Sequence, residues 1–152
     1  PVLTKKCRPV TEFNSRLWQL LDDMKETLAD AQGLGLAAPQ VGILRRLCIV
    51  AEENEDGSLE YFELINPVIT KKEGAVTLYE GCLSIPGRNG AIERPQNVTV
   101  TAQDRSGKVF TMDGQDMLAR AICHETDHLD GITILDLATD FYEDHEEDSE
   151  EE

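Results

Sequence analysis

The stretch that decides the fold is Ala121-Ile-Cys-His124-Glu125-Thr-Asp127-His128, which has the pattern His-Glu-x-x-His. On an α-helix, positions i and i+4 lie on one face about one turn apart, so both imidazoles can reach one metal ion. The glutamate beside the first histidine can then serve as general base on a water at that ion. The alternative is a solvated helix that carries the pattern by chance. A catalytic metal site therefore also requires, elsewhere in the chain, a third ligand and a hydrogen-bond donor that stabilises the transition state.

Two helices are predicted. The residues around the histidines predict one from about Gly114 to Leu129, with Asp113 as its cap and a glycine after its end. A longer helix is predicted from a cap at Thr11 to about Ala31. Its apolar residues recur at three- and four-residue steps and form one face: Phe13, Leu17, Leu20, Leu21, Met24 and Leu28. This first helix is a structural element without evident chemistry.

Between the helices the sequence predicts short strands, at residues 46–51, 59–65, 68–71, 75–79, 97–104 and 108–112. Asp56-Gly57 and Arg105-Ser-Gly107 are typical hairpin turns, and Asn66-Pro67 predicts a further turn. We therefore expect an α+β fold with short, mostly antiparallel strands around a central helix that carries the histidines, and a long N-terminal helix. Residues 1–138 are expected to form a single catalytic domain.

The charge of the chain is strongly negative. The 152 residues carry a net charge of −16, which argues against a nucleic-acid-binding surface. Half of that charge comes from eight carboxylates within Glu143–Glu152, so residues 139–152 are predicted to be a disordered acidic tail, with an interaction tail as the alternative. His145 lies in this tail and is expected to be a bystander. No apolar run is long enough to span a membrane, and Pro1–Lys5 lacks the apolar region of a signal peptide.

The four cysteines show no CxxC pairing, and nothing indicates secretion, so we expect a reducing cytoplasm. Cys48 lies in an apolar strand and is expected in the core. Cys82 follows Gly81 at the end of a strand, where an exposed turn would present a thiolate as a soft ligand for a divalent metal. A buried small residue is the alternative, but catalytic metal sites commonly use three protein ligands, and the two histidines favour Cys82 as the third.

A stretch of small residues, Gly33-Leu-Gly35-Leu-Ala-Ala-Pro39-Gln40-Val-Gly42, follows the first helix. Small residues permit the backbone to approach a ligand or another backbone closely. A tight connector between helix and strand is the alternative. Gln40 is polar in otherwise apolar surroundings, and its side chain requires hydrogen-bond partners if it is buried.

Three segments together resemble, in order and spacing, the signature motifs of peptide deformylase: Gly33-Leu-Gly35-Leu-Ala-Ala-Pro39-Gln40, Glu80-Gly81-Cys82-Leu83-Ser84 and His124-Glu125-Thr-Asp127-His128. The resemblance extends from Pro1 to about Asp136. It implies one divalent metal held by Cys82, His124 and His128, typically ferrous iron, with nickel, cobalt or zinc able to replace it. It also implies a substrate, the N-formyl-methionyl end of a nascent chain, from which formate is released.

The resemblance assigns catalytic roles as well. Glu125 would take a proton from the attacking water and return it to the departing amine. The side-chain amide of Gln40 and the backbone N–H of Leu83 would stabilise the oxyanion, where such donors matter most. An ion pair between Asp127 and Arg94 is also implied. Glu80 is left open between a contact with an arginine at position 88 and one with the substrate backbone.

A substrate pocket follows from helix geometry, because residues seven, four and three positions before His124 share its face. The predicted pocket, which would accept an unbranched thioether side chain, consists of Leu34, Leu78, Met117, Ala121 and the aliphatic stem of Arg120. Plain core packing is the alternative for Met117 and Ala121. Backbone groups of Gly35 and Gly81 could pair with an extended substrate.

Two rival functions remain. A zincin-type peptidase uses the same helix motif, but the pairing of Cys82 with Gln40 favours deformylase. The second rival is a protein of another functional class, a catalytically silent relative that is retained for binding. The presence of all five residues with a predicted chemical role argues against it. The expected partners are formyl-methionyl peptides, with possible ribosome proximity, no membrane and no direct nucleic-acid binding. The protein is expected to be a cytoplasmic monomer.

Overall fold

The computed structural model describes residues 5–82, 85–132 and 141–143, with the backbone alone at residues 79, 81–82, 85–89 and 141–143. Its elements follow in the order α1 (Ser15–Ala31), β1 (Gly35–Ala37), the 3-10 helix η2 (Ala38–Val41), β2 (Leu47–Glu53), β3 (Leu59–Glu73), β4 (Val76–Cys82), β5 (Ile85–Arg94), β6 (Asn97–Gln103), β7 (Val109–Gln115), α2 (Asp116–Leu129) and β8 (Phe141–Glu143). The expected α+β class is confirmed. Neither described helix has the length and apolar character needed to cross a membrane.

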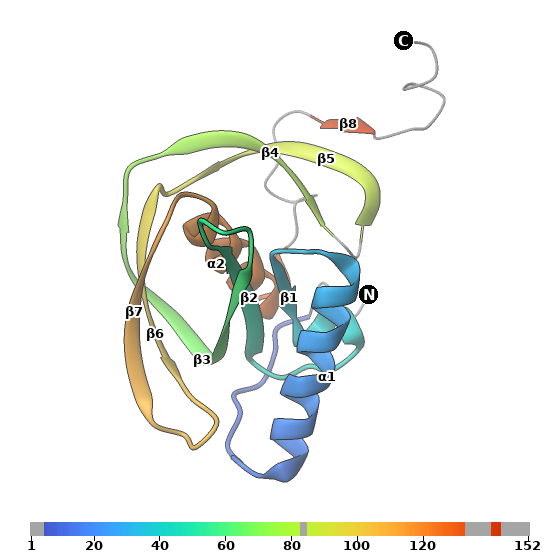
Figure 1. Ribbon diagram of the computed structural model, residues 1–152, viewed down its shortest axis with the longest axis vertical. Helices are drawn as coiled ribbons and strands as arrows, with labels where there is room; N and C mark the ends of the chain where they lie inside the picture. The colour runs from blue at the N-terminus through green and yellow to red at the C-terminus, as the bar shows by residue number, and fades with distance from the viewer. Residues whose placement is uncertain (1–4, 83–84, 133–140, 144–152) are drawn as a thin grey trace.

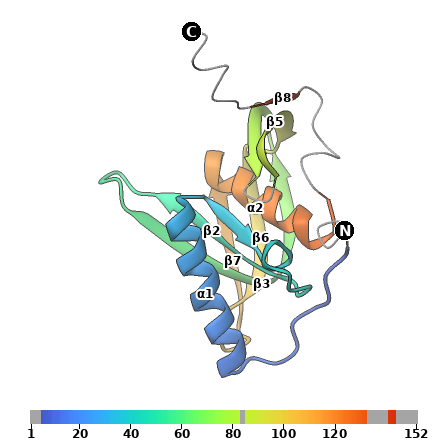
Figure 2. The same cartoon turned by 90° about the vertical axis from the view of Figure 1, so that its right-hand side faces the viewer.

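The strands form two antiparallel sheets. One has the order β1-β2-β3-β6-β7 and the other the order β4-β5-β8. In both views α2 lies at the centre of the fold, and α1 lies on the outer side of β1 and β2 (Figure 1 and Figure 2). Among the described strands, β1 pairs only with β2 and β4 only with β5, so each leaves one edge open.

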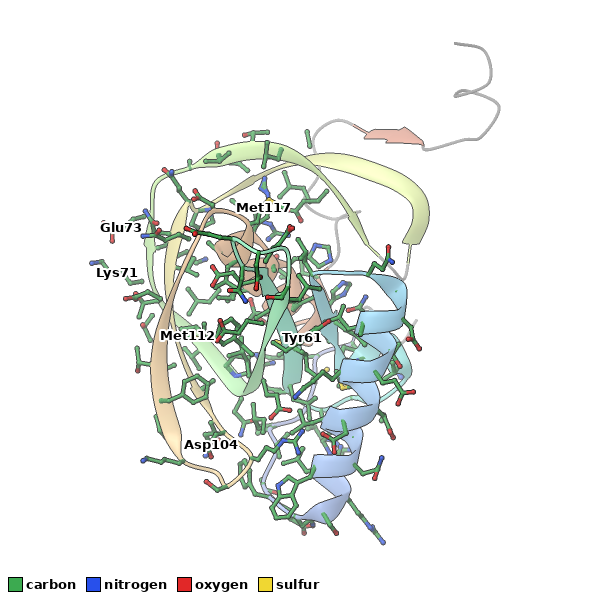
Figure 3. All side chains as sticks on the ribbon, in the orientation of Figure 1. Tyr61, Lys71, Glu73, Asp104, Met112 and Met117 are labelled. Atoms are coloured by element: carbon green, nitrogen blue, oxygen red, sulfur yellow. The ribbon has the colours of Figure 1, made fainter. Side chains whose placement is uncertain are left out.

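Alternation along β2 produces two cores. Cys48 and Val50 pack in the core that includes α2, whereas Leu47 and Ile49 pack in the core that includes α1. Successive side chains of a strand point to opposite faces, so one strand supports both helices. Figure 3 shows the side chains of both layers; Met112 packs against the α2 core and Tyr61 against the α1 core. Cys48 is fully buried, as predicted.

Both helices begin later than predicted. The N-cap of α1 is Asn14 and not Thr11, because the Asn14 side chain accepts a hydrogen bond from the Leu17 N–H at 3.2 Å. Asp113 does not cap α2. It belongs to β7, where its carboxylate accepts a hydrogen bond from the Thr99 hydroxyl at 2.7 Å, and the N-cap of α2 is Gln115. Both hairpin turns lie where they were predicted.

The turn predicted at Asn66-Pro67 is wrong, because β3 continues through it. Asn66 has a φ of 51°, and the pairing with β6 shifts between Ile65 and Val68, so the strand is bent and not ended. The Asn66 side chain accepts a hydrogen bond from the Val10 N–H at 2.8 Å and donates one to the Val10 carbonyl at 2.9 Å. These bonds stabilise the bend and fix the N-terminal segment against it.

Two further segments differ from the sequence prediction. Ile85–Arg94 forms β5, which was not predicted, because a proline and two glycines interrupt its pattern. Residues 141–143, within the predicted disordered tail, form β8, in which Phe141 pairs with Gly90. The remainder of that predicted tail lies outside the described residues.

An ion-pair network attaches α1 to the sheet. Arg105, in the β6–β7 turn, pairs with Glu63 on β3 and with Asp22 on α1, and Lys25 lies 3.0 Å from Glu63. Burial raises the pKa of Glu63, but hydrogen bonds from Arg105 and Lys25 outweigh burial and hold the pKa below its usual value. The network therefore stabilises the folded protein most when Glu63 is ionised.

Candidate metal centre

Helix α2 brings the two histidines and the glutamate of the motif into the interior. His124, Glu125 and His128 are all buried, and each offers a ligand atom within 4.8 Å of the others. Helical spacing places positions 124 and 128 one turn apart, as the sequence predicted. Hydrophobic neighbours on the same helix, Leu118 and Ile122, pack in the core and hold this face toward the sheet.

The imidazoles face one another through their Nε2 atoms, which lie 3.2 Å apart. His124 Nδ1 lies 2.9 Å from Glu80 Oε1, and because an ionised carboxylate can only accept, Nδ1 donates, so Nε2 is the ring nitrogen that a metal ion would take. Burial is the main reason that the pKa of His128 is lowered to about 3, so this ring is neutral. Two nitrogens bound to one tetrahedral ion at ordinary Zn–N lengths would be separated by about 3.3 Å. The observed spacing therefore fits a shared divalent cation.

Glu80 orients His124 and is itself held by arginines. Arg94 donates to both carboxylate oxygens of Glu80, at 3.1 and 3.2 Å, and Arg120 Nε lies 3.2 Å from Glu80 Oε2. Burial raises the pKa of Glu80, but hydrogen bonds with His124 and Arg94 outweigh burial and lower the pKa, so the carboxylate is ionised. Arg94 also donates to Asp127, which confirms the expected ion pair. A hydrogen-bonded carboxylate behind a ligating imidazole is the usual support of a metal site.

Glu125 is almost completely buried, and burial is the main reason that its pKa is raised to about 7. Its Oε1 atom has no hydrogen-bond partner among the described residues. A carboxyl group with a pKa near neutrality can both accept and release a proton, which is what a general acid–base group requires. The geometry therefore fits the role that the sequence motif predicted.

Gly35 on β1 makes room for this carboxyl group. A Cβ atom at position 35 would lie 2.5 Å from Glu125 Oε2 and 2.7 Å from Glu125 Cγ, which is far inside normal contact. The small residue is therefore required at this point so that α2 can pack against β1 with the glutamate between them. The glycine-containing stretch does make a close approach, but its partner is a side chain of the protein and not the ligand or backbone that the sequence analysis considered.

Gln40 is held by the local fold of η2. Its Oε1 atom accepts a hydrogen bond of 2.8 Å from the Ala37 N–H, at the start of the 3-10 helix. With its oxygen engaged, the amide is oriented by the backbone, and its NH₂ group is turned away from Ala37. Gln40 therefore has the kind of hydrogen-bond partner that the sequence analysis expected for a buried amide.

The structure describes only the backbone of Cys82, the third predicted metal ligand. Cys82 is the last residue of β4, where its backbone pairs with Ile85 after a register shift. The thiol of Cys82 and the whole of Leu83 lie outside the described residues. The roles predicted for these two residues stay predictions.

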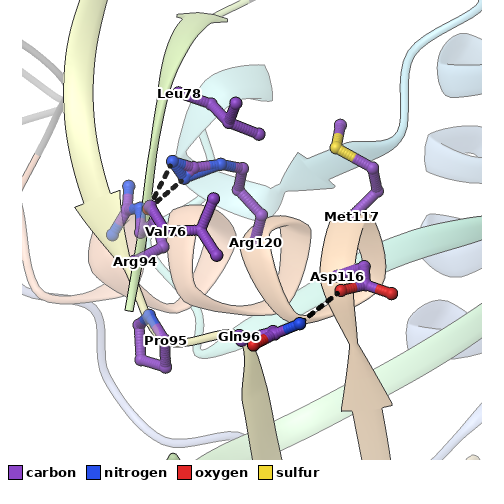
Figure 4. A pocket seen from close by; sticks show the side chains of 8 residues that line it. All are labelled: Val76, Leu78, Arg94, Pro95, Gln96, Asp116, Met117 and Arg120. Carbon is purple, nitrogen blue, oxygen red and sulfur yellow. Dashed lines mark hydrogen bonds between the residues drawn. The ribbon is translucent and has the colours of Figure 1, made fainter. Parts of the chain in front are cut away.

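A cavity of about 180 Å³ lies between β4, β5 and the start of α2. Leu78, Met117 and Arg120 line it together, as predicted, and Figure 4 shows their side chains around the space. Leu34 and Ala121 are not in its lining, and Ala121 packs in the α2 core. The Arg120 guanidinium donates hydrogen bonds to the backbone carbonyls of Val76 and Ile92.

Sequence reasoning missed the role of Glu80 because its partner lies 44 positions away on another element. The only signal was its place beside the predicted ligand Cys82. The contact that the sequence left open is made with Arg94, Arg120 and His124 among the described residues.

Comparisons with known proteins agree with this site. The family model described as polypeptide deformylase matches residues 1–143. The peptide deformylase of Heliobacterium modesticaldum is 53% identical over 136 residues, which cover 90% of this chain and 87% of the relative. The peptide deformylase of Caldicellulosiruptor bescii is 48% identical over 145 residues, with 95% and 84% covered. The crystal structure of the Thermotoga maritima peptide deformylase superposes with a TM-score of 0.85 at 35% identity, covering 91% of this chain and 92% of that one.

Proposed function

The chain belongs to the polypeptide deformylase family, and we propose that the buried group on α2, completed by Cys82, is the centre at which it acts. The protein is a metal-dependent hydrolase that removes the N-formyl group from nascent polypeptides. The observation that carries the proposed site is the 3.2 Å separation of the Nε2 atoms of His124 and His128. Two imidazoles whose Nε2 atoms face each other at this distance are oriented to share one cation.

The proposed ligands are His124, His128 and the thiolate of Cys82. A divalent cation held by them supplies Lewis-acid chemistry, which activates a water molecule and polarises the formyl carbonyl. Mixed thiolate and imidazole ligation suits both iron and zinc, and ferrous iron is the metal that we propose, with nickel, cobalt or zinc as replacements. Glu80 fixes the ring of His124, so this ligand needs little reorganisation.

Glu125 is the proposed general base and acid. It accepts the proton of the attacking water at its carboxylate and later delivers that proton to the amine nitrogen as the C–N bond of the formamide breaks. The pKa of about 7 that burial gives this residue suits both transfers at neutral pH. The products are formate and the free amino terminus of the methionine.

Gln40 and Leu83 are the proposed oxyanion donors. Charge develops on the formyl oxygen as the water adds, and N–H groups already in place stabilise it without reorganisation. The hydrogen bond from Ala37 to Gln40 supports this role, because it fixes the amide before the substrate arrives.

The substrate is proposed to bind as an extended strand. The open edges of β1 and β4 carry Gly35 and Gly81, whose backbone groups can pair with the peptide. The cavity lined by Leu78, Met117 and Arg120 takes the methionine side chain, with Leu34 and Ala121 as neighbouring surfaces. Backbone pairing makes recognition depend little on the later residues of the nascent chain.

The wider setting completes the proposal. We place the enzyme in the cytoplasm as a monomer, near the ribosome where formylated chains emerge, and away from membranes. Residues 1–138 are proposed as the single catalytic domain, followed by the acidic tail.

The test is formate release from formyl-Met-Ala-Ser by protein purified anaerobically, with metal analysis of the same sample. One equivalent of metal and steady formate release are expected. Glu125→Ala should retain the metal and lose formate release, whereas Cys82→Ala should lose the metal. Wild-type turnover in the Glu125 variant would refute its role, and stoichiometric metal in the Cys82 variant would remove Cys82 from the ligands. Bound metal without any formate release would favour a silent relative.

A further inference from the structure

The cavity beside the start of α2 has a charged wall. Two of its lining residues are arginines, Arg94 on β5 and Arg120 on α2, and both side chains are buried (Figure 4). Leu78 and Met117 supply apolar surface to the same cavity, and both are exposed to solvent. A side chain that fills the cavity therefore lies against two apolar groups on one hand and two buried cations on the other.

Both arginines hold the same carboxylate oxygen. Arg94 Nε lies 3.1 Å and Arg120 Nε lies 3.2 Å from Glu80 Oε2. The second oxygen of this carboxylate, Oε1, lies 2.9 Å from His124 Nδ1. The cavity wall, the carboxylate and the imidazole therefore follow one another in direct contact. Glu80 is the single group that lies between the arginines of the cavity and a proposed metal ligand.

The contact between Arg120 and Glu80 is incomplete. The terminal nitrogens of Arg120 donate hydrogen bonds to the backbone carbonyls of Val76 and Ile92. Its Nε atom is buried and has no aligned hydrogen bond among the described residues, although Glu80 Oε2 is within reach. A buried donor without an aligned acceptor costs free energy. A small shift of the Arg120 side chain that completes this bond would therefore be favourable, and a group that fills the cavity lies against the side chain that has to shift.

Exclusion of water from the cavity acts in the same direction. The attraction between two opposite charges rises as the dielectric constant around them falls. A long apolar side chain that fills the cavity of about 180 Å³ leaves little room for water against the guanidinium groups, and so strengthens their attraction to Glu80. A short side chain such as that of alanine leaves this space to water. Both effects therefore depend on how well the substrate fills the cavity.

We infer that Arg120 is a positioning residue that couples the filling of this cavity, through Glu80, to the orientation of His124. The inference rests on the proposed function, in which the cavity takes the methionine side chain. That side chain completes the bond between Arg120 and Glu80, and the fixed carboxylate holds the His124 ring in its ligating orientation. Binding energy from a part of the substrate remote from the reacting bond is then used in the transition state. Methionine therefore raises kcat and does not only lower KM.

A purely structural role of Arg120 makes a different prediction. Its bonds to the carbonyls of Val76 and Ile92 attach α2 to β4 and β5. If attachment were its whole role, loss of the guanidinium would slow every formylated substrate by the same factor. The coupling predicts a loss that depends on the first side chain of the substrate, so the ratio of two substrates separates the two roles.

The test compares Arg120→Met with the matched variant Arg46→Met. Arg46 also attaches α2 to a sheet, because it donates to the Leu129 carbonyl at 3.1 Å and pairs with Asp130 at 2.9 Å, but it lies outside the site and the cavity. Formate release from formyl-Met-Ala-Ser and from formyl-Ala-Ala-Ser is measured for the wild type and both variants. The quantity compared is the kcat ratio, which is kcat for the methionine substrate divided by kcat for the alanine substrate.

The kcat ratio should be about tenfold in the wild type, the order expected for one charge-assisted hydrogen bond. It should fall below about threefold in Arg120→Met and stay at about tenfold in Arg46→Met. The corresponding ratio of KM values should change less than about threefold in Arg120→Met, because Leu78 and Met117 still bury the methionine side chain. Arg120→Lys keeps a cation for the two carbonyls but has no Nε–H, so it should lose the kcat ratio as well, and it replaces Arg120→Met if that variant does not fold.

A second readout follows the imidazole directly. The chain has three histidines, so ¹⁵N-histidine NMR of the zinc-loaded protein can observe the Nδ1 resonance of His124. Saturation with the product Met-Ala-Ser should move this resonance in the wild type and in Arg46→Met, and should leave it in place in Arg120→Met. Ala-Ala-Ser should leave it in place in all three proteins.

Three results would overturn the inference. They are an equal kcat for the two substrates in the wild type, an equal loss of kcat for both substrates in Arg120→Met, and a His124 resonance that responds to Met-Ala-Ser in Arg120→Met as it does in the wild type. Absence of formate release from either substrate would count against the proposed function. The NMR measurement would still decide the coupling in that case, because it requires no turnover.

Discussion

Substitution of Gly35 by alanine tests the contact on which the proposed general base depends. The new Cβ would lie 2.5, 2.7 and 2.9 Å from Oε2, Cγ and Cδ of Glu125. Normal contacts between carbon atoms are about 3.5–4.0 Å, so a relative movement of about 1 Å is required. The strand cannot easily retreat, because Gly35 pairs with Val50 and the Leu34 carbonyl accepts a hydrogen bond of 2.8 Å from Ala51. The Glu125 side chain must therefore yield.

Two effects of different kind are expected in Gly35→Ala. Overpacking of a well-filled interior costs about 1–3 kcal/mol of unfolding free energy. A displacement of about 1 Å at a reacting group costs on the order of 100-fold in rate. We expect kcat for formyl-Met-Ala-Ser to fall by about that factor, with metal content unchanged, because the three atoms nearest to the new methyl group all belong to Glu125 and none to a histidine.

The matched control is Gly114→Ala. Its Cβ would lie 2.9 Å from Ile122 Cδ1 and so would crowd the same helix, and its three nearest atoms belong to Ile122, Ala119 and Leu118 and not to Glu125. Both variants are unfolded in urea and assayed for formate release. Gly114→Ala should lose stability of the same order and retain its rate, whereas Gly35→Ala should lose both. A Gly35→Ala enzyme with the wild-type kcat would refute the claim that this glycine positions the base.

The remaining predictions concern charged groups. Glu80→Gln should bind metal about 10–100-fold more weakly in a chelator competition, because His124 loses its ionised support; unchanged affinity would contradict this. Arg94→Ala should cost about 3–5 kcal/mol in urea unfolding, since it removes the arginine that pairs with Asp127 and one of the two arginines that hold the buried Glu80 carboxylate, and a loss below about 1 kcal/mol would argue against the network. Glu63→Gln should cost about 2 kcal/mol at pH 7. Folding lowers the pKa of Glu63, so the difference in unfolding free energy between the variant and the wild type should be complete above pH 4.5. It should shrink as the pH falls through the lowered pKa of the folded protein. A difference that does not change with pH would exclude an ionic origin.

The parts of the fold that local periodicity determines could be predicted from the sequence. The His-Glu-x-x-His spacing placed both histidines on one helical face, the apolar run at residues 46–51 predicted β2, and the alternation of Val98 and Val100 with polar residues predicted β6. The ends of the helices were less predictable, because several polar residues near each end can serve as caps. Asn14 and Thr11 differ little as cap residues, and the fold of the preceding segment decided between them.

Contacts between distant segments could not be predicted in the same way. Nothing local to Gly35 indicates that a glutamate 90 positions later will occupy the space of its missing side chain. The bonds of Glu80 and Arg120 likewise depend on how the β4–β5 hairpin lies over α2. In β5, a proline and two glycines concealed a strand that β4 stabilises by pairing. Tertiary pairing can override weak local preference, and it did so here.

Local and distant contributions meet at Glu125, and they explain why the motif alone does not define this chemistry. The helix fixes the position of the glutamate relative to both histidines, but a solvated glutamate on that helix would have an ordinary pKa. The pKa of about 7 comes from burial, and β1 makes that burial sterically possible by carrying a glycine where any larger residue would collide. His124 shows the same division, because its spacing comes from the helix and its tautomer from Glu80 on β4. The helix therefore supplies the reacting groups, while the two sheets set their protonation and orientation.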